Sequence, residues 1–483
     1  MRIAINRRQI ISLLGTAPLM SSMSRASSID IRAFGARGDG QHDDTDAIQR
    51  SIDEASSSGG TLVAIPKCDL AKGEYWRLTR PLFLRSGVTI RGEGPESLLY
   101  NDRKTSTTFM DQAVILPGNY HPQFLNSIKF DAAEALNASG DILSVSGPTD
   151  RYNPGTIIFV RTTDFDPARA EVSISSRTII CRIKRIHNNE ITIDRPVPTD
   201  ASLVVAPSNG QVYWRRIGAP SYCFVATSSK LLNLGIRSEG FWIGDSAARE
   251  CSFENLWIDS RVGIYGNLFQ DCIWRNIHLT FDRLAVELSC NSVNVLVENL
   301  NARMRTDPPV PNHQIIAIQE SARNCTVRNF FIDANVFEKS APVIRFGPSS
   351  VCTILSGEIR CEAAKGAMVS FDTGVSAVEG NAVRDVSFHC GAALLGISFD
   401  PTRSGTVRNN RIENVSINGP RIQIAAKIGG TANTINKSKL AGSRMVILPS
   451  ARNCLVSDST IPSTIDPSGS QTGRVDFLHN RAL

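Results

Sequence analysis

The sequence predicts an all-β protein: a parallel β-helix, or solenoid, with an N-terminal capping helix and an inserted small β module. Three observations favour this fold class. A unit of alternating apolar and polar residues recurs along the second half of the chain, its turn residue is repeatedly asparagine, and the gaps between units vary. A chain of 483 residues is also too long for one compact core, and its 42% hydrophobic content is typical of a folded chain.

Residues 1–26 predict an export signal peptide. The paired arginines Arg7 and Arg8 precede the apolar run from Ile10 to Met20, and Ser24-Arg25-Ala26 forms a small-residue cleavage site. The arginine pair resembles a twin-arginine signal, with a Sec signal or a buried strand as alternatives. The segment therefore predicts a periplasmic or secreted bacterial protein that engages the export machinery.

Charge and hydropathy argue against two other kinds of partner. The formal net charge is +6, but four arginines and no acidic residue lie in residues 1–26, so the remainder is nearly balanced. This balance argues against nucleic-acid binding. No run of eighteen apolar residues occurs, so no membrane span is predicted.

Residues 27–100 predict the N-terminal cap and the first coils of the solenoid. Asp44 or Thr45 begins a helix with one apolar face, and Gly59-Gly60 ends it. Strand patterns follow at residues 61–66 and 81–94. The pair Asp43 and Asp44 is reminiscent of a catalytic carboxylate pair, but we expect a structural role in closing the end of the solenoid.

Residues 101–222 interrupt the recurring pattern and predict the inserted β module. Strand patterns occur at residues 155–160 and 177–186, and Asn188-Asn189 forms the turn of a hairpin that continues to Asp194. We expect the module to lie on one side of the solenoid, where it can form a wall at one end of a substrate groove. Residues 461–483 are expected to form a tail with little core content.

Residues 223–460 carry the recurring units and predict the main coils. The clearest copies have asparagine at the turn, and weaker copies have other residues there. The turn residues are Asn255, Asn276, Asn299, Asn329, Ser356, Asp385, Asn414, Ser438 and Asp458. In a parallel β-helix, successive coils lie about 4.8 Å apart, so these side chains are expected to stack as a ladder of amides.

Cysteines begin several of the units and are expected to form an inward-facing stack of free thiols. They are Cys251, Cys272, Cys325, Cys352 and Cys454. Disulfides and a metal site are the alternatives, but stacked parallel side chains suit a disulfide poorly and no CxxC or Cys/His cluster is present. No metal ligands are predicted.

The N-terminal block resembles a known family. Phe34-Gly35-Ala36-Arg37-Gly38-Asp39-Gly40 leads to Asp43-Asp44-Thr45, and Ser86-Gly87-Val88-Thr89-Ile90-Arg91-Gly92 follows the strand pattern. Residues 28–98 thus resemble the opening of the pectate lyase superfamily, whose fold is the pectin lyase-like right-handed parallel β-helix. The superfamily includes lyases, polygalacturonase-like hydrolases, epimerases and phage tailspikes, so the resemblance implies carbohydrate handling without fixing one reaction.

The resemblance places the site on the outer side of the strand that follows the ladder turn. Charged and polar residues occur there two, four and six positions after the ladder residue, and flanking loops add more. The candidate catalytic residues are Asp259, His278, Asp282, Arg283, Arg303, Arg305, Asp333 and Glu338. The candidate substrate-binding residues are Arg261, Asn301, His313, Asn335, Arg345 and Arg360.

Two reactions fit this strip, and a polysaccharide lyase is preferred over a glycoside hydrolase. A lyase needs a base, such as His278, and positive charge such as Arg303 beside a uronate carboxylate. No cofactor is required, although Ca²⁺ on the aspartates would assist. A hydrolase needs two carboxyl groups about 5–5.5 Å apart for retention or about 6.5–9.5 Å apart for inversion.

Sequence motifs do not decide between these reactions. The Asn-Thr-Asp, Asp-Asp, Gly-His-Gly and Arg-x-Lys set of polygalacturonases is absent from the coils, and so is the Asp-Pro-His-Glu motif of mannuronan epimerases. The sequence therefore predicts an exported enzyme that acts on an acidic polysaccharide, with lyase first, polygalacturonase-like hydrolase second, and a non-catalytic glycan-binding surface protein third.

Overall fold

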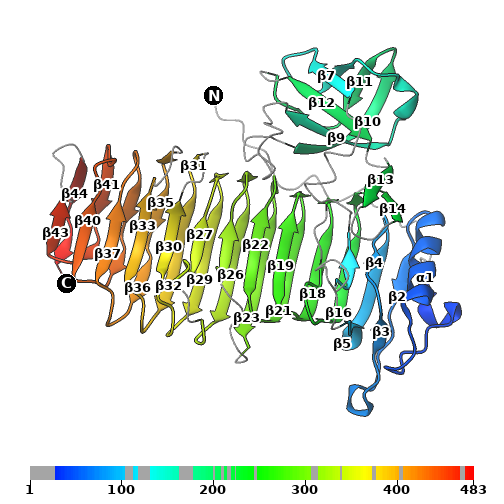
Figure 1. Ribbon diagram of the computed structural model, residues 1–483, viewed down its shortest axis with the longest axis horizontal. Coiled ribbons are helices and arrows are strands. Elements are labelled where there is room, and N and C mark those ends of the chain that lie inside the picture. Colours follow the sequence, from blue (N-terminus) through cyan, green and yellow to red (C-terminus); the bar gives the residue numbers. More distant parts are fainter. Residues whose placement is uncertain are drawn as a thin grey trace, which may run out of the picture.

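The computed structural model is a long solenoid of parallel strands with a helix at one end and a separate β module along one edge (Figure 1). It describes residues 28–103, 113–117, 131–162, 178–199, 202–207, 211–214, 219–222, 225–243, 247–305, 314–337, 340–372, 377–401, 406–467 and 474–482. The predicted export signal lies outside these residues. None of the helices within the described ranges is long and apolar enough to cross a membrane.

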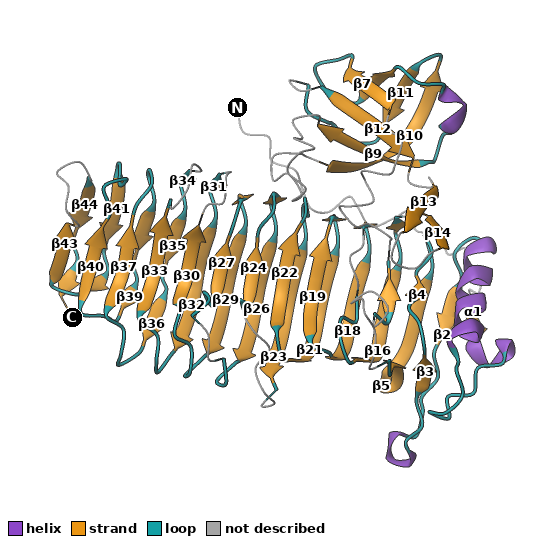
Figure 2. Cartoon of the chain, in the orientation of Figure 1, coloured by secondary structure: helices purple, strands orange, loops and turns teal. Residues whose placement is uncertain are grey.

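The N-terminal end of the solenoid is covered by helix α1 (Thr45–Ser57), which buries Ile48, Ile52 and Ala55 against the first coil (Figure 2). The 3-10 helix η1 (Ile31–Phe34) precedes it. Asp44 is fully buried, and its carboxylate accepts hydrogen bonds from the backbone N–H groups of Arg37 (2.7 Å) and Gly38 (3.1 Å). The predicted structural role of this acid is thereby confirmed, since it holds the glycine-rich loop beside the cap.

One large parallel sheet, which we call the ladder sheet, runs the length of the solenoid. Each strand pairs in register with its equivalent in the next coil. Its strands are β1 (Ser28–Asp30), β2 (Leu62–Ala64), β3 (Trp76–Leu78), β5 (Thr89–Asn101), β16 (Lys230–Ser238), β18 (Ser252–Asp259), β21 (Ile273–Phe281), β23 (Leu296–Met304), β26 (Thr326–Asp333), β29 (Thr353–Arg360), β32 (Ala382–His389), β35 (Arg411–Glu413), β36 (Ser416–Asn418), β38 (Thr434–Asn436), β39 (Lys439–Leu440), β41 (Cys454–Ser457), β42 (Thr460–Ile461), β44 (Val475–Leu478) and β45 (Arg481–Ala482).

A second parallel sheet faces the ladder sheet across the core. Its strands are β19 (Val262–Asn267), β22 (Leu284–Ser289), β24 (Ile316–Ile318), β27 (Ile344–Phe346), β30 (Ala367–Asp372), β33 (Leu395–Asp400), β37 (Ile424–Ile428), β40 (Arg444–Ile447) and β43 (Thr464–Pro467). β4 (Leu82–Phe83) and β6 (Ile115–Leu116) form a separate two-stranded parallel sheet, and Ile115 of β6 bridges Ile243. Other short strands close the coils: β15 (Ala226–Thr227), β17 (Ala248–Arg249), β20 (Phe269–Gln270), β25 (Ala322–Arg323), β28 (Ser349–Ser350), β31 (Val378–Glu379) and β34 (Val407–Arg408).

The predicted amide ladder is present in the ladder sheet. Asn276 donates from Nδ2 to Oδ1 of Asn255 (2.8 Å) and accepts at Oδ1 from Nδ2 of Asn299 (2.8 Å). Equivalent positions in every described coil from β16 onward have a left-handed backbone with positive φ, which Asn and Asp tolerate better than most residues. These ladder positions are Asn233, Asn255, Asn276, Asn299, Asn329, Ser356, Asp385, Asn414, Lys437, Asp458 and His479.

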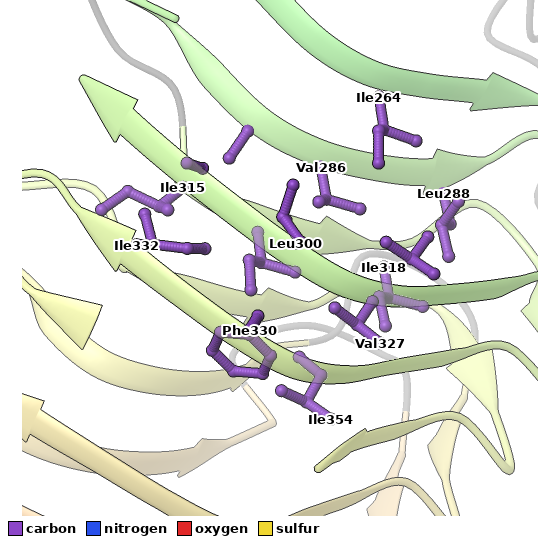
Figure 3. Close-up of a cluster of buried hydrophobic side chains, with 14 of the residues drawn as sticks. Ile264, Val286, Leu288, Leu300, Ile315, Ile318, Val327, Phe330, Ile332 and Ile354 are labelled. Atoms are coloured by element: carbon purple, nitrogen blue, oxygen red, sulfur yellow. The ribbon is translucent and has the colours of Figure 1, made fainter. Parts of the chain in front are cut away.

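The core lies between the two sheets and follows from the alternating pattern of each strand. In Figure 3, Leu300 of β23 and Phe330 of β26 point toward Val286 and Ile318 of the second sheet. All cysteines within the described ranges are free thiols, and those that begin the units are buried. The expected stack of free core thiols is confirmed in this part of the chain.

The inserted module is a closed antiparallel barrel of β7 (Asp131–Ala135), β8 (Ile142–Val145), β9 (Ile157–Thr162), β10 (Thr178–His187), β11 (Glu190–Ile193) and β12 (Leu203–Pro207), with the 3-10 helix η4 (Thr149–Arg151). The predicted hairpin turn at Asn188-Asn189 joins β10 to β11. A two-stranded ribbon, β13 (Gln211–Trp214) and β14 (Ala219–Tyr222), follows the barrel.

The barrel contacts the solenoid at a closing corner, not at the ladder sheet. Arg249 pairs with Asp194 of the barrel (Nη2 to Oδ2, 2.5 Å), and the Gln270 side chain accepts a hydrogen bond from the backbone N–H of Ile180 (3.0 Å). Phe159 is buried at the same interface. These contacts anchor the barrel along the upper edge of the solenoid in Figure 1.

The C-terminal segment differs from the prediction of a tail. Strands β43, β44 and β45 pair in parallel register with the preceding coil, for example Val456 with Phe477. Its side chains are mostly exposed or half-buried because no further coil covers them among the described residues. This segment thus adds a further coil to the solenoid despite its low apolar content.

Candidate functional site

A groove of about 400 Å³ lies on the outer face of the ladder sheet, at the N-terminal part of the solenoid. Its floor comes from four adjacent strands, β16, β18, β21 and β23, which lie side by side in Figure 1. The residues that line it are Leu70, Pro95, Leu98, Gly235, Ile236, Arg237, Trp257, Ile258, Asp259, His278, Leu279, Thr280, Asn301 and Arg303.

Two outward rows of the ladder sheet supply the polar residues of this groove. Two positions after the ladder residue, Trp257 pairs with His278 and His278 with Asn301. Four positions after it, Asp259 pairs with Thr280, and Thr280 pairs with Arg303. Residues 21 or 23 positions apart in sequence are thereby neighbours at the spacing of adjacent strands, as the repeat predicted.

The first row contains an aromatic pair. The rings of Trp257 and His278 are stacked with centroids 5.6 Å apart and an interplanar angle of 5°. His278 is exposed, and its side chain makes no hydrogen bond or ion pair among the described residues. One face of the imidazole is therefore packed against the indole, while its ring nitrogens are available to a ligand in the groove.

Two arginines on either side fix the carboxylate of Asp259. Arg237 donates from Nε to Oδ2 of Asp259 (3.1 Å), and Arg305 binds the other oxygen, Oδ1. With both oxygens engaged by guanidinium groups, the Asp259 carboxylate is held in place.

Asp282 lies behind the groove and is more buried than Asp259. Its side chain is 16% exposed, and its Oδ2 atom lies 3.6 Å from Arg305 Nη1 and 3.7 Å from Arg261 Nε. Its other oxygen is buried without a hydrogen-bond partner in the described part of the protein. Burial raises the pKa of Asp282, despite the opposing effect of the neighbouring arginines.

Arg303 and Asn301 supply the free polar groups of β23. Both are exposed, both line the groove, and neither side chain has a hydrogen-bond or ion-pair partner within the described ranges. The Thr280 hydroxyl, beside Arg303, is likewise without a partner there. A guanidinium that is not neutralised by the protein is suited to bind a carboxylate of a ligand.

Other candidate residues lie outside this groove. Asp333 and Arg360 continue the second row on β26 and β29, and Asn335 is exposed just beyond β26. Arg360 is bound to Glu358 (Nε to Oε1, 2.7 Å), so its charge is already paired. His313 and Glu338 lie outside the described residues.

Two arginines that the sequence placed in the strip belong to the second sheet instead. Arg345 is on β27, where it binds both carboxylate oxygens of Asp372 at 3.0 Å. Arg283 directly precedes β22 and is half-buried, and this burial lowers its pKa. Both residues therefore lie apart from the strip on the ladder sheet, because the chain has already turned toward the second sheet, and their candidate roles remain predictions.

Some residues that line the groove are not among the predicted site residues. Arg237 belongs to a coil at β16 whose unit, Asn233-Leu234-Gly235-Ile236-Arg237, matches the later units and was detectable from its spacing. Leu70, Pro95 and Leu98 had no such signal, because they come from a loop and a bulge that do not recur. None of the described residues of the inserted module lines this groove.

The carboxylates do not fit a Ca²⁺ site. No group of three or more His, Cys, Asp or Glu side chains suited to a metal ion occurs among the described residues. Asp259 and Asp282 both face Arg305, whose positive charge occupies the space between them. Any step in the reaction is therefore derived from the side chains themselves.

Comparison with known proteins confirms the resemblance stated from the sequence. Residues 28–160 match the family model described as rhamnogalacturonase A/epimerase, pectate lyase-like. Alginate lyase 7 of Azotobacter vinelandii is 41% identical over 66 residues, which are 14% of this chain and only 8% of that protein's length. The N-terminal part of the chain thus has the sequence features of the pectate lyase-like superfamily.

Solved structures confirm the fold over nearly the whole chain. The surface protein and adhesin PfbA of Streptococcus pneumoniae has a TM-score of 0.54 and 12% identity, with 94% of this chain and 97% of that chain covered. The catalytic unit of a GH87 α-1,3-glucanase from Streptomyces thermodiastaticus has a TM-score of 0.50 and 12% identity, with 95% and 68% covered. At this identity, the likeness establishes the right-handed parallel β-helix and no particular activity.

Proposed function

We propose that this protein is an exported enzyme that cleaves an acidic polysaccharide by β-elimination in the groove of the ladder sheet. The observation that supports the proposal is that one groove is lined by Arg303, a cation without an ion-pair partner among the described residues, and by His278, an available base. His278 pairs with Asn301, which lies two residues from Arg303 on the same face of β23. The Cα atoms of His278 and Arg303 are therefore about 8 Å apart.

The chemistry assigned to each residue follows from this arrangement. Arg303 binds the carboxylate of a uronic acid and stabilises the negative charge that develops on it. His278 removes the proton at C5, the electrons of that bond form a double bond between C4 and C5, and the bond between C4 and the glycosidic oxygen breaks. The leaving oxygen takes up a proton, from the protonated His278 or from water. One product then carries an unsaturated sugar at its new end, and the other carries a new hydroxyl group. Asn301 and Thr280 are placed to orient the sugar hydroxyls between the two groups.

The second candidate is a glycoside hydrolase that uses Asp259 and Asp282. The raised pKa of Asp282 favours it, because a general acid must keep its proton near neutral pH. Asp259 and Asp282 both approach Arg305, so their carboxyl groups lie near one another, as a pair of catalytic carboxylates requires. We rank it second because Arg237 and Arg305 already engage Asp259, and Asp282 does not line the groove.

A panel of polyuronates and bacterial exopolysaccharides tests the proposal. The ultraviolet absorbance of the unsaturated product and the number of new reducing ends are measured together. β-Elimination produces both signals in equal amounts, and the Arg303→Ala variant loses both. Reducing ends without the absorbance would establish the hydrolase instead, and Asp282→Ala would then remove activity. Tight binding with neither signal would favour a glycan-binding protein.

A further inference from the structure

The groove is closed at its β5 side by a bulge in the ladder sheet. Gly94 of β5 pairs with Leu234, but the next residue of β16, Gly235, pairs with Leu98. Pro95, Glu96 and Ser97 are therefore three extra residues without a pairing partner on β16, which makes this a larger, special β-bulge. The backbone N–H of Glu93 donates to the Ser97 hydroxyl (2.9 Å), which holds the bulge closed.

The bulge lies directly over the first row of the groove. A Cβ atom built on Gly235 would come within 2.2 Å of the Pro95 carbonyl oxygen. Gly235 occupies the same outward row as Trp257, His278 and Asn301. The row of side chains that lines the groove therefore ends at Gly235, where backbone of the bulge takes the place of a side chain.

A loop that carries the 3-10 helix η2 (Leu70–Lys72) reinforces the bulge. The backbone N–H of Cys68 donates to the carbonyl oxygen of Glu96 (3.0 Å), and the Lys67 ammonium lies 3.8 Å from the Glu96 carboxylate. The base of the loop is closed because the Glu74 N–H donates to the Asp69 carbonyl (3.1 Å) and the Asp69 N–H to the Glu74 carboxylate (3.1 Å). Leu70 thereby lines the groove from a loop with a fixed base.

Polar groups beyond this wall are engaged with one another. The Tyr100 hydroxyl donates to Glu239 (2.6 Å), and the guanidinium of Arg237 lies over the Tyr100 ring at 5.5 Å. On the opposite side, the lining ends with Asn301 and Arg303 of β23, and none of the described loops contributes to it. There the outward rows continue onto β26 as Phe331 and Asp333.

We propose that this groove accepts a free end of the polysaccharide, so that the enzyme removes short products from chain ends and does not cut internally. The inference rests on the function proposed above. The glycan runs along the solenoid axis over β23, β21 and β18, and its end abuts the wall formed by Leu70, Pro95 and Leu98. The remainder of the chain leaves over β26, where the rows stay exposed or half-buried.

The product lengths of a polyuronate that the wild-type enzyme cleaves test this inference. Products are separated by size at early times, and viscosity is followed against the number of bonds cleaved. The wild type should release one short product from the first time point while most of the polymer keeps its length. Replacing residues 70–73 by Asn-Gly, which keeps Asp69 and Glu74 at the base, should shift the early products to mixed lengths and make viscosity fall faster per bond cleaved.

Point variants provide the matched comparison if the shortened loop impairs folding. Leu70→Ala should also lengthen the early products, whereas Leu394→Ala should not, because Leu394 is similarly exposed (48% against 42%) but lies next to β33. Mixed-length products from the wild type at the first time point would overturn the inference and leave the lyase in place. If none of the polyuronates yields the unsaturated product, the proposed function fails and the inference fails with it.

Discussion

Arg303 and Arg305 lie two residues apart near the end of β23, and their surroundings assign them different roles. Arg305 binds Asp259 and approaches Asp282 to 3.6 Å, whereas Arg303 has no partner within the described ranges. Arg305 neutralises acids of the protein, and Arg303 is available to a ligand. We therefore expect function and stability to be separated between them.

Arg303→Ala should lower kcat/KM by about 100-fold or more with little change in the midpoint of thermal unfolding, because it removes one stabilising group of the transition state. Arg305→Ala should lower the unfolding midpoint, since it leaves Asp282 with less compensation for its burial. Arg411→Ala is the control for both assays. Arg411 is an exposed residue of β35 whose side chain has no hydrogen-bond or ion-pair partner in the described part of the chain. Full activity in Arg303→Ala would place the site elsewhere.

The carboxylate of Glu298 should make the stability of the protein depend on pH. It is buried beside the ladder, and Arg275 (2.5 Å) and Arg328 (2.6 Å) bind its carboxylate and lower its pKa. A lowered pKa in the folded state means that the carboxylate stabilises the fold above its unfolded pKa, near 4.5, and that this stability disappears as pH falls through the lower folded value.

Glu298→Gln should therefore cost about 1–2 kcal/mol of unfolding free energy at neutral pH, and the difference from wild type should shrink below pH 4.5. Chemical denaturation at several pH values measures it. Glu413→Gln is the control, because Glu413 occupies the equivalent position on β35 but is only half-buried, with a longer contact to Arg384 (3.4 Å). A pH-independent difference would contradict the assignment.

At the scale of the element, each strand of the ladder sheet depends on its ladder residue. The Asn276 side chain forms hydrogen bonds with the side-chain amides of the coils before and after it. Its φ of +56° is unfavourable for a residue whose side chain cannot form such hydrogen bonds. Asn276→Ala should destabilise the protein by about 2–3 kcal/mol, because it loses two hydrogen bonds and keeps the unfavourable backbone.

Asn276→Gly separates the two contributions. It also loses both hydrogen bonds, but glycine adopts positive φ without strain, so it should be about 1 kcal/mol more stable than Asn276→Ala. Thermal and urea unfolding of the two variants measure the difference. Equal destabilisation by alanine and glycine would show that backbone conformation contributes nothing at this position.

Neighbouring strands also match in volume across the core. Gly357 on β29 pairs with Phe330 on β26, at a position where other coils have leucine, isoleucine or valine. A Cβ at Gly357 would come within 2.1 Å of the Phe330 ring. Gly357→Ala should therefore cost about 1–3 kcal/mol. The cost should fall in a Phe330→Leu background, and an unchanged cost there would contradict the proposed contact.

The recurring units explain how much of these elements was predictable. Where the turn residue is asparagine, as at Asn255 and Asn329, pattern and structure agree on the ladder position. In the coil at residues 433–440, the pattern chose Ser438, but the left-handed residue is Lys437, since Thr434 pairs with Leu455. Lysine has no side-chain reason to occupy a turn of this kind, so composition alone could not locate it.

In the whole molecule, the solenoid places residues that are distant in sequence next to one another. Arg237, Asp259, His278 and Arg303 come from four successive coils and meet in one groove. This part of the site was predictable because strand register follows the repeat. The end wall was not, because the bulge at Pro95 and the loop at Leu70 occur once and have no counterpart in other coils.

The barrel illustrates the same difference. Its strands and hairpin were recognisable from local patterns, but its position depends on contacts such as Arg249 with Asp194, which no periodicity connects. It therefore stands at a closing corner of the solenoid instead of beside the groove.

The mass of the products formed in water enriched in the heavy oxygen isotope tests the central proposal most directly. β-Elimination adds no water to the cleaved bond, so we expect the product with the new unsaturated end to be one water molecule lighter than the saturated oligosaccharide and to carry no heavy oxygen. Products of saturated mass that incorporate the heavy isotope at the new end would contradict the account and establish hydrolysis.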